Sequence, residues 1–205
     1  MYTNSAPATV IILKRPVAPF EEIRQERKAG RLDRPEQIYE RFVQPLEGQM
    51  IRSVWQVLRD PDDAEDALQD SLAVIWKRLK RISRHPNPRA LVLRICLDVA
   101  HDKLRRKLRR ERRESTSPVS LNVPDSAPGP EARVSGQESR SEVLRAIGHL
   151  SRNQGTAFLM RVVQEQSYQD IARALGCAEQ TARTHVARAR GALRRLLPDL
   201  APASE

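Results

Sequence analysis

Residues that build β-sheets are scarce in this chain. Aromatic residues make up only 4% of its 205 residues, and only 8 residues are glycine. No run alternates apolar and polar residues in the company of Val, Ile, Thr and aromatics, which is the pattern of half-buried strands. Long stretches consist instead of Leu, Ala, Arg, Glu and Gln, which favour helices. We therefore expect an all-α fold.

Cysteines and long apolar runs are also few. Cys96 and Cys177 are far apart in predicted helical regions, which favours a reducing cytoplasm over a disulfide framework. The apolar run from Val10 to Leu13 is too short for a signal-peptide core and follows no basic residue. Nothing approaches a membrane-spanning length. We expect a cytoplasmic protein without membrane insertion.

Catalytic and metal-binding patterns are missing as well. Asp62 and Asp66, or Asp66 and Asp70, share a helical face, but no third ligand accompanies them. No glycine-rich phosphate loop and no Ser-His-Asp arrangement can be assembled. The histidines show no ligand spacing; they are His85, His101, His149 and His185. We expect no catalytic residue, no metal and no cofactor, and rank a metal-dependent nuclease third among the hypotheses.

Positive charge is what the chain has in excess. It carries 36 Lys and Arg against 26 Asp and Glu, a formal net charge of +10. Such a balance indicates an anionic partner, either nucleic acid or an anionic membrane surface, unless the basic surface is merely solvated. A membrane surface is the least favoured, because the basic helix end has no aromatic-rich apolar face.

Composition divides the chain into five segments. Residues 1–35 contain several prolines and are expected to be a poorly structured extension. Two helical domains, 36–114 and 141–198, flank a segment rich in Ser, Pro and Gly at 115–140, which is typical of a flexible linker. Residues 199–205 form a short tail.

The first domain shows three helical patterns, so we expect three to four helices there. An apolar stripe runs from Ile38 to Val57, and Pro45 predicts a kink or two shorter helices within it. A second helix opens at Asp60 or Pro61, with acidic residues at its start and basic residues at its end, and its expected buried face runs from Ala64 to Leu79. A third begins near Arg89 and ends in a strongly basic run, and its expected buried residues are Leu91, Val92, Ile95, Val99 and Leu104.

The second domain is expected to contain about four helices, of which the last two show a helix-turn-helix pattern. A short helix over Tyr168–Leu175 is followed by Gly176, which can adopt the left-handed conformation that ends a helix. A longer helix then begins at about Glu179. Ala172 and Ala182 allow the two helices to approach closely. In this motif the second helix lies in the major groove of DNA. The alternative is an ordinary amphipathic helix pair with a solvated face.

The polar face of the second helix carries residues able to contact bases. Arg can bind guanine with two hydrogen bonds, and Gln can bind adenine in the same way. The candidates are Gln180, Thr181, Arg183, Thr184 and Arg188.

Together these parts resemble sigma-70-family RNA polymerase sigma factors of the extracytoplasmic-function (ECF) group. In the first domain the resemblance to region 2 lies in Asp62–Asp70 followed by Ile75-Trp76, in Pro88–Ile95, and in Asp102–Arg106. In the second domain the resemblance to region 4 lies in Leu175-Gly176, Thr181 and Ala187–Arg190.

The resemblance implies a set of partners: core RNA polymerase, promoter DNA and an anti-sigma factor. Residues implied in docking on the clamp helices of the largest polymerase subunit are Asp62, Asp66, Gln69 and Asp70. Those implied at the −10 element and its phosphates are Arg89, Arg94, Asp98, Lys103, Arg105 and Arg106. Those implied at the −35 element are Gln180, Thr181, Arg183, Thr184, His185 and Arg188.

Two positions depart from the family pattern. Leu91 stands where many members have Trp, and Asp98 stands where many have Asn. A carboxylate near a single DNA strand repels phosphate, so Asp98 either changes the −10 preference or faces the protein. The competing hypothesis is a helix-turn-helix regulator that binds DNA without polymerase. Such a regulator needs no acidic helix in its first domain and usually dimerises on symmetric half-sites.

Overall fold

The computed structural model describes residues 34–115 and 141–198, and within these ranges the regular structure is entirely helical. The expected all-α fold is therefore confirmed for these ranges. The N-terminal extension up to residue 33, the linker at 116–140 and the tail at 199–205 lie outside the described residues.

The chain first folds into two helices joined by a short 3-10 turn. Helix α2 (Pro35–Phe42) is followed by η1 (Gln44–Leu46) and by α3 (Glu47–Leu58). Pro45 lies in the first turn of η1, where its missing N–H leaves no hydrogen bond unmade. The prediction of two shorter helices around this proline is confirmed.

Helix α4 (Pro61–Lys77) begins where the sequence indicated. The carboxylate of Asp60 accepts a hydrogen bond from the backbone N–H of Asp63 at 2.9 Å, which caps the helix. The helix ends one turn earlier than its apolar pattern suggested. Leu79, expected on the same buried face, is buried at the start of a separate short helix, α5 (Leu79–Ser83).

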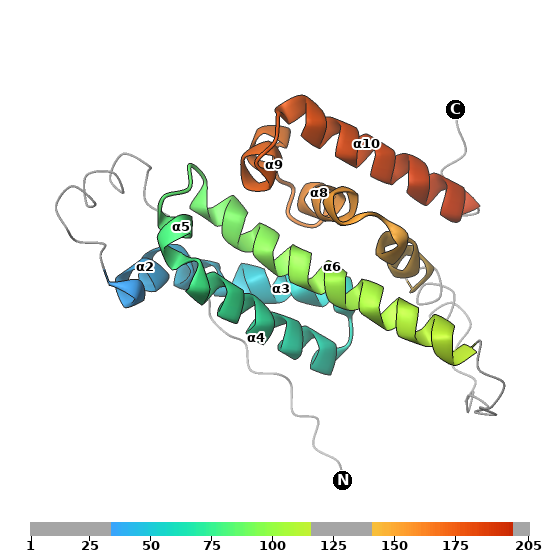
Figure 1. Cartoon of the computed structure of the whole chain (residues 1–205), viewed down its shortest axis with the longest axis horizontal. Helices are drawn as coiled ribbons and strands as arrows, with labels where there is room; N and C mark the ends of the chain where they lie inside the picture. Colours follow the sequence, from blue (N-terminus) through green and yellow to red (C-terminus); the bar gives the residue numbers. More distant parts are fainter. Residues whose placement is uncertain (1–33, 116–140, 199–205) are drawn as a thin grey trace, which may run out of the picture.

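Helix α6 (Pro88–Ser115) is 28 residues long and lies at the centre of the molecule. The Asn87 side chain accepts a hydrogen bond from the backbone N–H of Ala90 at 2.9 Å near its start. Besides its predicted apolar residues, Leu93, Cys96 and Leu97 are completely buried. Helix α6 is buried on more than one face, because α3 and α4 pack against it on one side and α8 and α9 on another (Figure 1). A single apolar stripe would predict only one buried face.

The second domain contains four helical segments, as predicted. Residues 141–149 are helical, followed by α8 (Arg152–Val162), α9 (Tyr168–Leu175) and α10 (Glu179–Leu196). Figure 1 shows α10 on the outer side of α8, away from α6, whereas α9 also packs against α6.

Helices α9 and α10 form the predicted helix-turn-helix. Gly176 has a φ of 68°, the left-handed conformation expected at the end of α9. Its N–H bonds to the carbonyl of Arg173 at 3.3 Å, and the N–H of Cys177 bonds to the carbonyl of Ala172 at 3.0 Å, which together form a Schellman cap. Ala172 and Ala182 are both buried, as close helix contact requires.

Buried residues of both domains belong to one continuous cluster. It extends from Ile38 in α2 through the residues of α6 to Val186 in α10. The two domains of the sequence are therefore packed together in this structure, with α6 as the element that contacts both sides.

Burial on α4 yields the first prediction. Replacing Ile75, which is 0% exposed, by Ala should lower the free energy of unfolding by about 2–5 kcal/mol, because a cavity remains in the core. Ile51→Ala on α3 is the matched control, since Ile51 is 44% exposed and its loss should cost about 0.5 kcal/mol or less. Urea unfolding measures both changes. Equal changes in the two variants would show that this helix face is not buried in solution.

Candidate nucleic-acid interface

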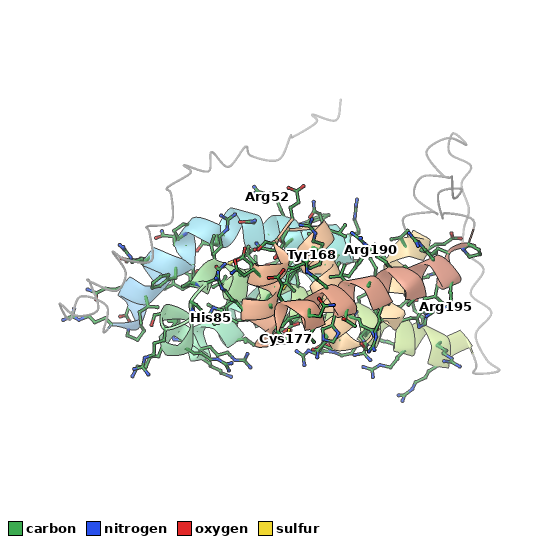
Figure 2. The ribbon with its side chains drawn as sticks, turned by 90° about the horizontal axis from the view of Figure 1, so that it is seen from above. Arg52, His85, Tyr168, Cys177, Arg190 and Arg195 are labelled. Atoms are coloured by element: carbon green, nitrogen blue, oxygen red, sulfur yellow. The ribbon has the colours of Figure 1, made fainter. Side chains whose placement is uncertain are left out.

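The outward face of α10 carries the residues predicted to contact the −35 element. Four of them are exposed, namely Gln180, Thr181, Arg183 and Arg188. Thr184 and His185 are half-buried, and the hydroxyl of Thr184 donates to the carbonyl of Gln180 at 2.9 Å. Figure 2 looks onto α10 and shows the labelled Arg190 and Arg195 farther along the same helix. The structure therefore gathers all six predicted residues on one helix whose outer face is open to solvent.

Arg183 is the most constrained side chain on this face. Its Nη2 and Nε donate to the same oxygen of Glu179, at 2.7 and 3.2 Å. Its Cζ also lies 4.5 Å from the centroid of the Tyr168 ring. Sequence reasoning picked out Arg183 but neither Glu179 nor Tyr168 as a partner, although the spacing of Glu179 and Arg183 is that of an ion pair along a helix.

Residues predicted for the −10 element do not form one surface. On α6, Arg89 donates to the side-chain oxygen of Gln49 at 2.9 Å, toward α3. Lys103 pairs with Asp66 of α4 at 3.1 Å and is only 15% exposed. Arg105 is half-buried and Arg106 is exposed.

Arg94 and Asp98 face the second domain. Arg94 donates to the carbonyl of Ala174 at the end of α9 at 2.7 Å, and its Nε pairs with Asp98 at 3.3 Å. The hydroxyl of Thr156 on α8 donates to Asp98 at 2.6 Å, and Arg152 lies 4.0 Å from the same carboxylate. Asp98 is thus directed at the protein, which corresponds to one of the two alternatives left open by the sequence.

His101 lies at the centre of the contact between the domains. Its side chain is 0% exposed, and its Nε2 lies 3.0 Å from the carbonyl of Ile147. Its Nδ1 is buried without a hydrogen-bond partner. Gly155 of α8 lies directly against the ring, because a Cβ at this position would come within 2.4 Å of it. No local pattern in the sequence indicates a role for His101 or Gly155, because their contact forms across the linker.

Further hydrogen bonds join the second domain to α6 and to the loop before it. The amide of Gln164 donates to the carbonyl of Leu93 at 3.2 Å. Asn87 donates to Asp170 at 2.7 Å, and His85 Nε2 lies 3.0 Å from the carbonyl of Arg173. These contacts cover part of the helix that the resemblance assigns to −10 DNA.

Acidic residues of α4 lie partly on an open surface and partly against α6. Asp62, Gln69 and Asp70 are exposed. Asp66 remains 71% exposed although it pairs with Lys103.

Nearby, Lys107 bonds to Asp63 at 2.7 Å, and this hydrogen bond raises the pKa of the lysine. Part of the basic run of α6 is therefore neutralised within the first domain.

The described ranges offer little support for a metal site, a reactive cysteine or a membrane span. Among residues 34–115 and 141–198, no group of three His, Cys, Asp or Glu could hold a metal ion. Both cysteines are free. Burial raises the pKa of the Cys96 thiol to about 12, so it stays protonated and unreactive. No helix of these ranges is long and apolar enough to cross a membrane.

Comparison with known proteins agrees with this architecture. A chain with a helix-turn-helix behind an acidic and a basic helix belongs to the class of DNA-binding transcription proteins. The family model of sigma-70 region 2 matches residues 42–110, and that of sigma-70 region 4 matches residues 140–193. The chain therefore belongs to the sigma-70 family.

A curated relative and two solved structures are similar to this chain. The ECF RNA polymerase sigma factor SigM of two Mycobacterium tuberculosis strains is 32% identical over 139 residues, which cover 68% of this chain and 66% of SigM. The structure of CnrH in complex with the cytosolic domain of CnrY is similar in fold, with a TM-score of 0.50, 18% identity and coverage of 87% of this chain and 96% of that one. A further match is RpoE of Bartonella quintana, crystallised with the anti-sigma factor NepR, with a TM-score of 0.47, 21% identity and coverage of 80% and 98%.

The environment of His101 predicts a dependence of stability on pH. Burial, as the largest cause, lowers the pKa of His101 below its ordinary 6.5, although the Ile147 carbonyl and the nearby Asp102 and Asp98 oppose the shift and Arg105 adds to it. A proton on Nδ1 would be a buried donor without a partner. The packed state should therefore keep its full stability above pH 6.5 and lose stability as the pH falls below it.

Thermal unfolding between pH 7.5 and pH 5.5 measures this effect. His101→Gln, which can still donate to the Ile147 carbonyl, should flatten the pH dependence. His149→Gln should leave it unchanged, because His149 is exposed. A wild-type pH profile in the His101 variant would contradict the assignment.

Proposed function

We propose that this chain is an ECF-type sigma factor that binds core RNA polymerase and directs promoter-specific transcription initiation. The observation that carries the proposal is the helix-turn-helix of α9 and α10, with its open polar face, in a chain that also matches region 2 of the family. The chain acts by binding, without catalysis or cofactor, and works in the cytoplasm where polymerase is found.

Recognition of the −35 element is assigned to α10. The proposed contacts come from Gln180, Thr181, Arg183, Thr184, His185 and Arg188. Support comes from their common position on the second helix of the motif, which lies in the major groove in proteins of this kind.

Recognition of the −10 element is assigned to α6 and the loop before it. The proposed contacts come from Arg89, Arg94, Lys103, Arg105 and Arg106, with Asp98 as the position that departs from the family. Since Arg94 and Asp98 contact α8 and α9 here, this assignment requires the two domains to separate before the −10 element is bound.

Docking on polymerase is assigned to the acidic face of α4. Asp62, Asp66, Gln69 and Asp70 lie on this helix and are exposed, so they are available to the clamp helices of the largest subunit. Polymerase would hold the two domains apart at a fixed distance and so raise the effective concentration of the second promoter contact. An anti-sigma factor would act in the opposite sense and hold the domains together.

A helix-turn-helix regulator that works without polymerase is the second candidate. Such a regulator explains helices α9 and α10, but it does not explain why the first domain matches sigma-70 region 2. No observation favours it specifically.

Transcription from a random promoter library tests the proposal. Bacterial core polymerase is assayed with and without the protein. Start sites that appear only with the protein, each preceded by two motifs at a fixed spacing, are the expected result. If polymerase is not redirected but the protein alone selects a DNA site, the second candidate is correct.

Charge reversal on α4 tests polymerase docking. Asp70→Lys should abolish binding to core polymerase while leaving the fold intact, because Asp70 is exposed and has no ion pair among the described residues. Glu40→Lys on α2 is the control, since it places the same charge change on another exposed helix. Fluorescence anisotropy with labelled protein measures the affinity. Equal affinities for the two variants would refute the docking role of Asp70.

Substitution of Gly155 tests whether the packed arrangement limits DNA binding. In Gly155→Ala the new Cβ would collide with the His101 ring, so α8 and α6 should move apart. The expected results are a larger radius of gyration by X-ray scattering and tighter binding of single-stranded −10 DNA by the free protein.

Gly191→Ala is the matched control for this experiment. The same change lies within α10, where the nearest atom would be 3.9 Å away, and any gain in helix propensity is common to both variants. If Gly155→Ala enlarges the radius of gyration but keeps the DNA affinity of the wild type, the domain contact does not restrict access to α6.

A further inference from the structure

Arg183 is held from two directions before any DNA is present. Glu179 accepts two of its hydrogen bonds, and the Tyr168 ring lies beneath its guanidinium group. We propose that Tyr168 and Glu179 position Arg183 to read a guanine in the −35 element, and so help to set promoter specificity without touching the base themselves. This inference rests on the proposed function.

The donors of Arg183 that remain free have the geometry that guanine requires. A guanidinium group has five N–H donors arranged as a planar fork. Glu179 accepts one from Nε and one from Nη2 through a single oxygen, Oε1. The end of the fork formed by Nη1 and the second Nη2 hydrogen carries no protein partner in the described part of the chain. Two parallel donors at that end match the O6 and N7 acceptors of guanine in the major groove.

The Tyr168 ring is itself fixed in place. Tyr168 begins α9, and Ser167 before it both accepts the backbone N–H of Asp170 at 3.1 Å and donates to the Asp170 carboxylate at 2.7 Å. A second guanidinium, that of Arg161, lies 5.3 Å from the ring centroid and donates to the carbonyl of Gln166 at 3.0 Å. Figure 2 labels Tyr168 beside α10. The Tyr168 ring is therefore held in a fixed position, and its face attracts the guanidinium cation of Arg183.

Stability alone does not account for the arrangement around Arg183. The side chains of Arg183 and Glu179 are 53% and 44% exposed, and ion pairs at such exposure contribute little to folding. A long flexible side chain loses conformational freedom when it binds DNA, so holding it in one orientation beforehand reduces that loss. The benefit of the two contacts is therefore expected in DNA recognition.

The test is selection from promoters with a randomised −35 element, using the complete holoenzyme and sequencing of the transcripts. Arg183→Ala should lower the preference at one G·C pair by about tenfold. Tyr168→Leu and Glu179→Ala should lower the preference at that same pair by about two- to fivefold, while Tyr168→Phe keeps it because the ring remains. Combined with Arg183→Ala, neither substitution should reduce the preference further, because all three act through one contact.

Glu165→Ala is the control, as it removes another exposed carboxylate that has no contact with Arg183. Unchanged preferences in the Tyr168 and Glu179 variants, or an equal loss at every position of the element, would overturn the positioning role. The positioning role would also be overturned if Arg183→Ala changed no base preference. A wild-type protein that fails to redirect polymerase at all would instead show that the proposed function is wrong, and the inference would fall with it.

Discussion

Helix α6 packs against both domains at once, and the rest of the structure depends on these two contacts. On one side it completes the first domain against α3 and α4, and on the other it binds α8 and α9. Its contact with the second domain is centred on two side chains that are costly to bury. Asp98 is stabilised by Thr156, Arg94 and Arg152, and the His101 ring lies against Gly155, where any larger residue would collide with it.

Beside the apolar cluster shared by the two domains, this contact contains several polar pairs, which suit the opening that the proposed function requires. Hydrogen bonds such as those of Gln164 to Leu93 and Asn87 to Asp170 can be exchanged for bonds to water or DNA at modest net cost. The apolar residues of the shared cluster, by contrast, would become exposed when the domains separate. In the proposed function, Arg94 changes its partner from the carbonyl of Ala174 to promoter DNA, so the closed and open states compete for the same side chain.

Of the basic residues behind the net charge of +10, some form ion pairs within the protein and others lie exposed on its surface. On α6, Lys103 and Lys107 are paired with acidic residues of α4 and its cap, which binds the two helices together. On α10 the cations are mostly outside, and Arg183 is oriented by its own neighbours on the protein. A count of basic residues thus indicates an anionic partner, but only the ion pairs show which cations are still available to it.

Local interactions are what the sequence by itself determined. The helix-turn-helix could be predicted because Gly176, Ala172 and Ala182 act within a few residues of one another, and the break at Pro45 and the cap at Asp60 are equally local. Five residues of the −35 face followed from helix periodicity, whereas His185 was added only by the resemblance to the family. The early end of α4, the orientation of Asp98 and the burial of His101 were decided only by the tertiary structure. Each depends on which helix lies opposite, and for Asp98 and His101 that helix comes from beyond the linker, so no short-range pattern could indicate it.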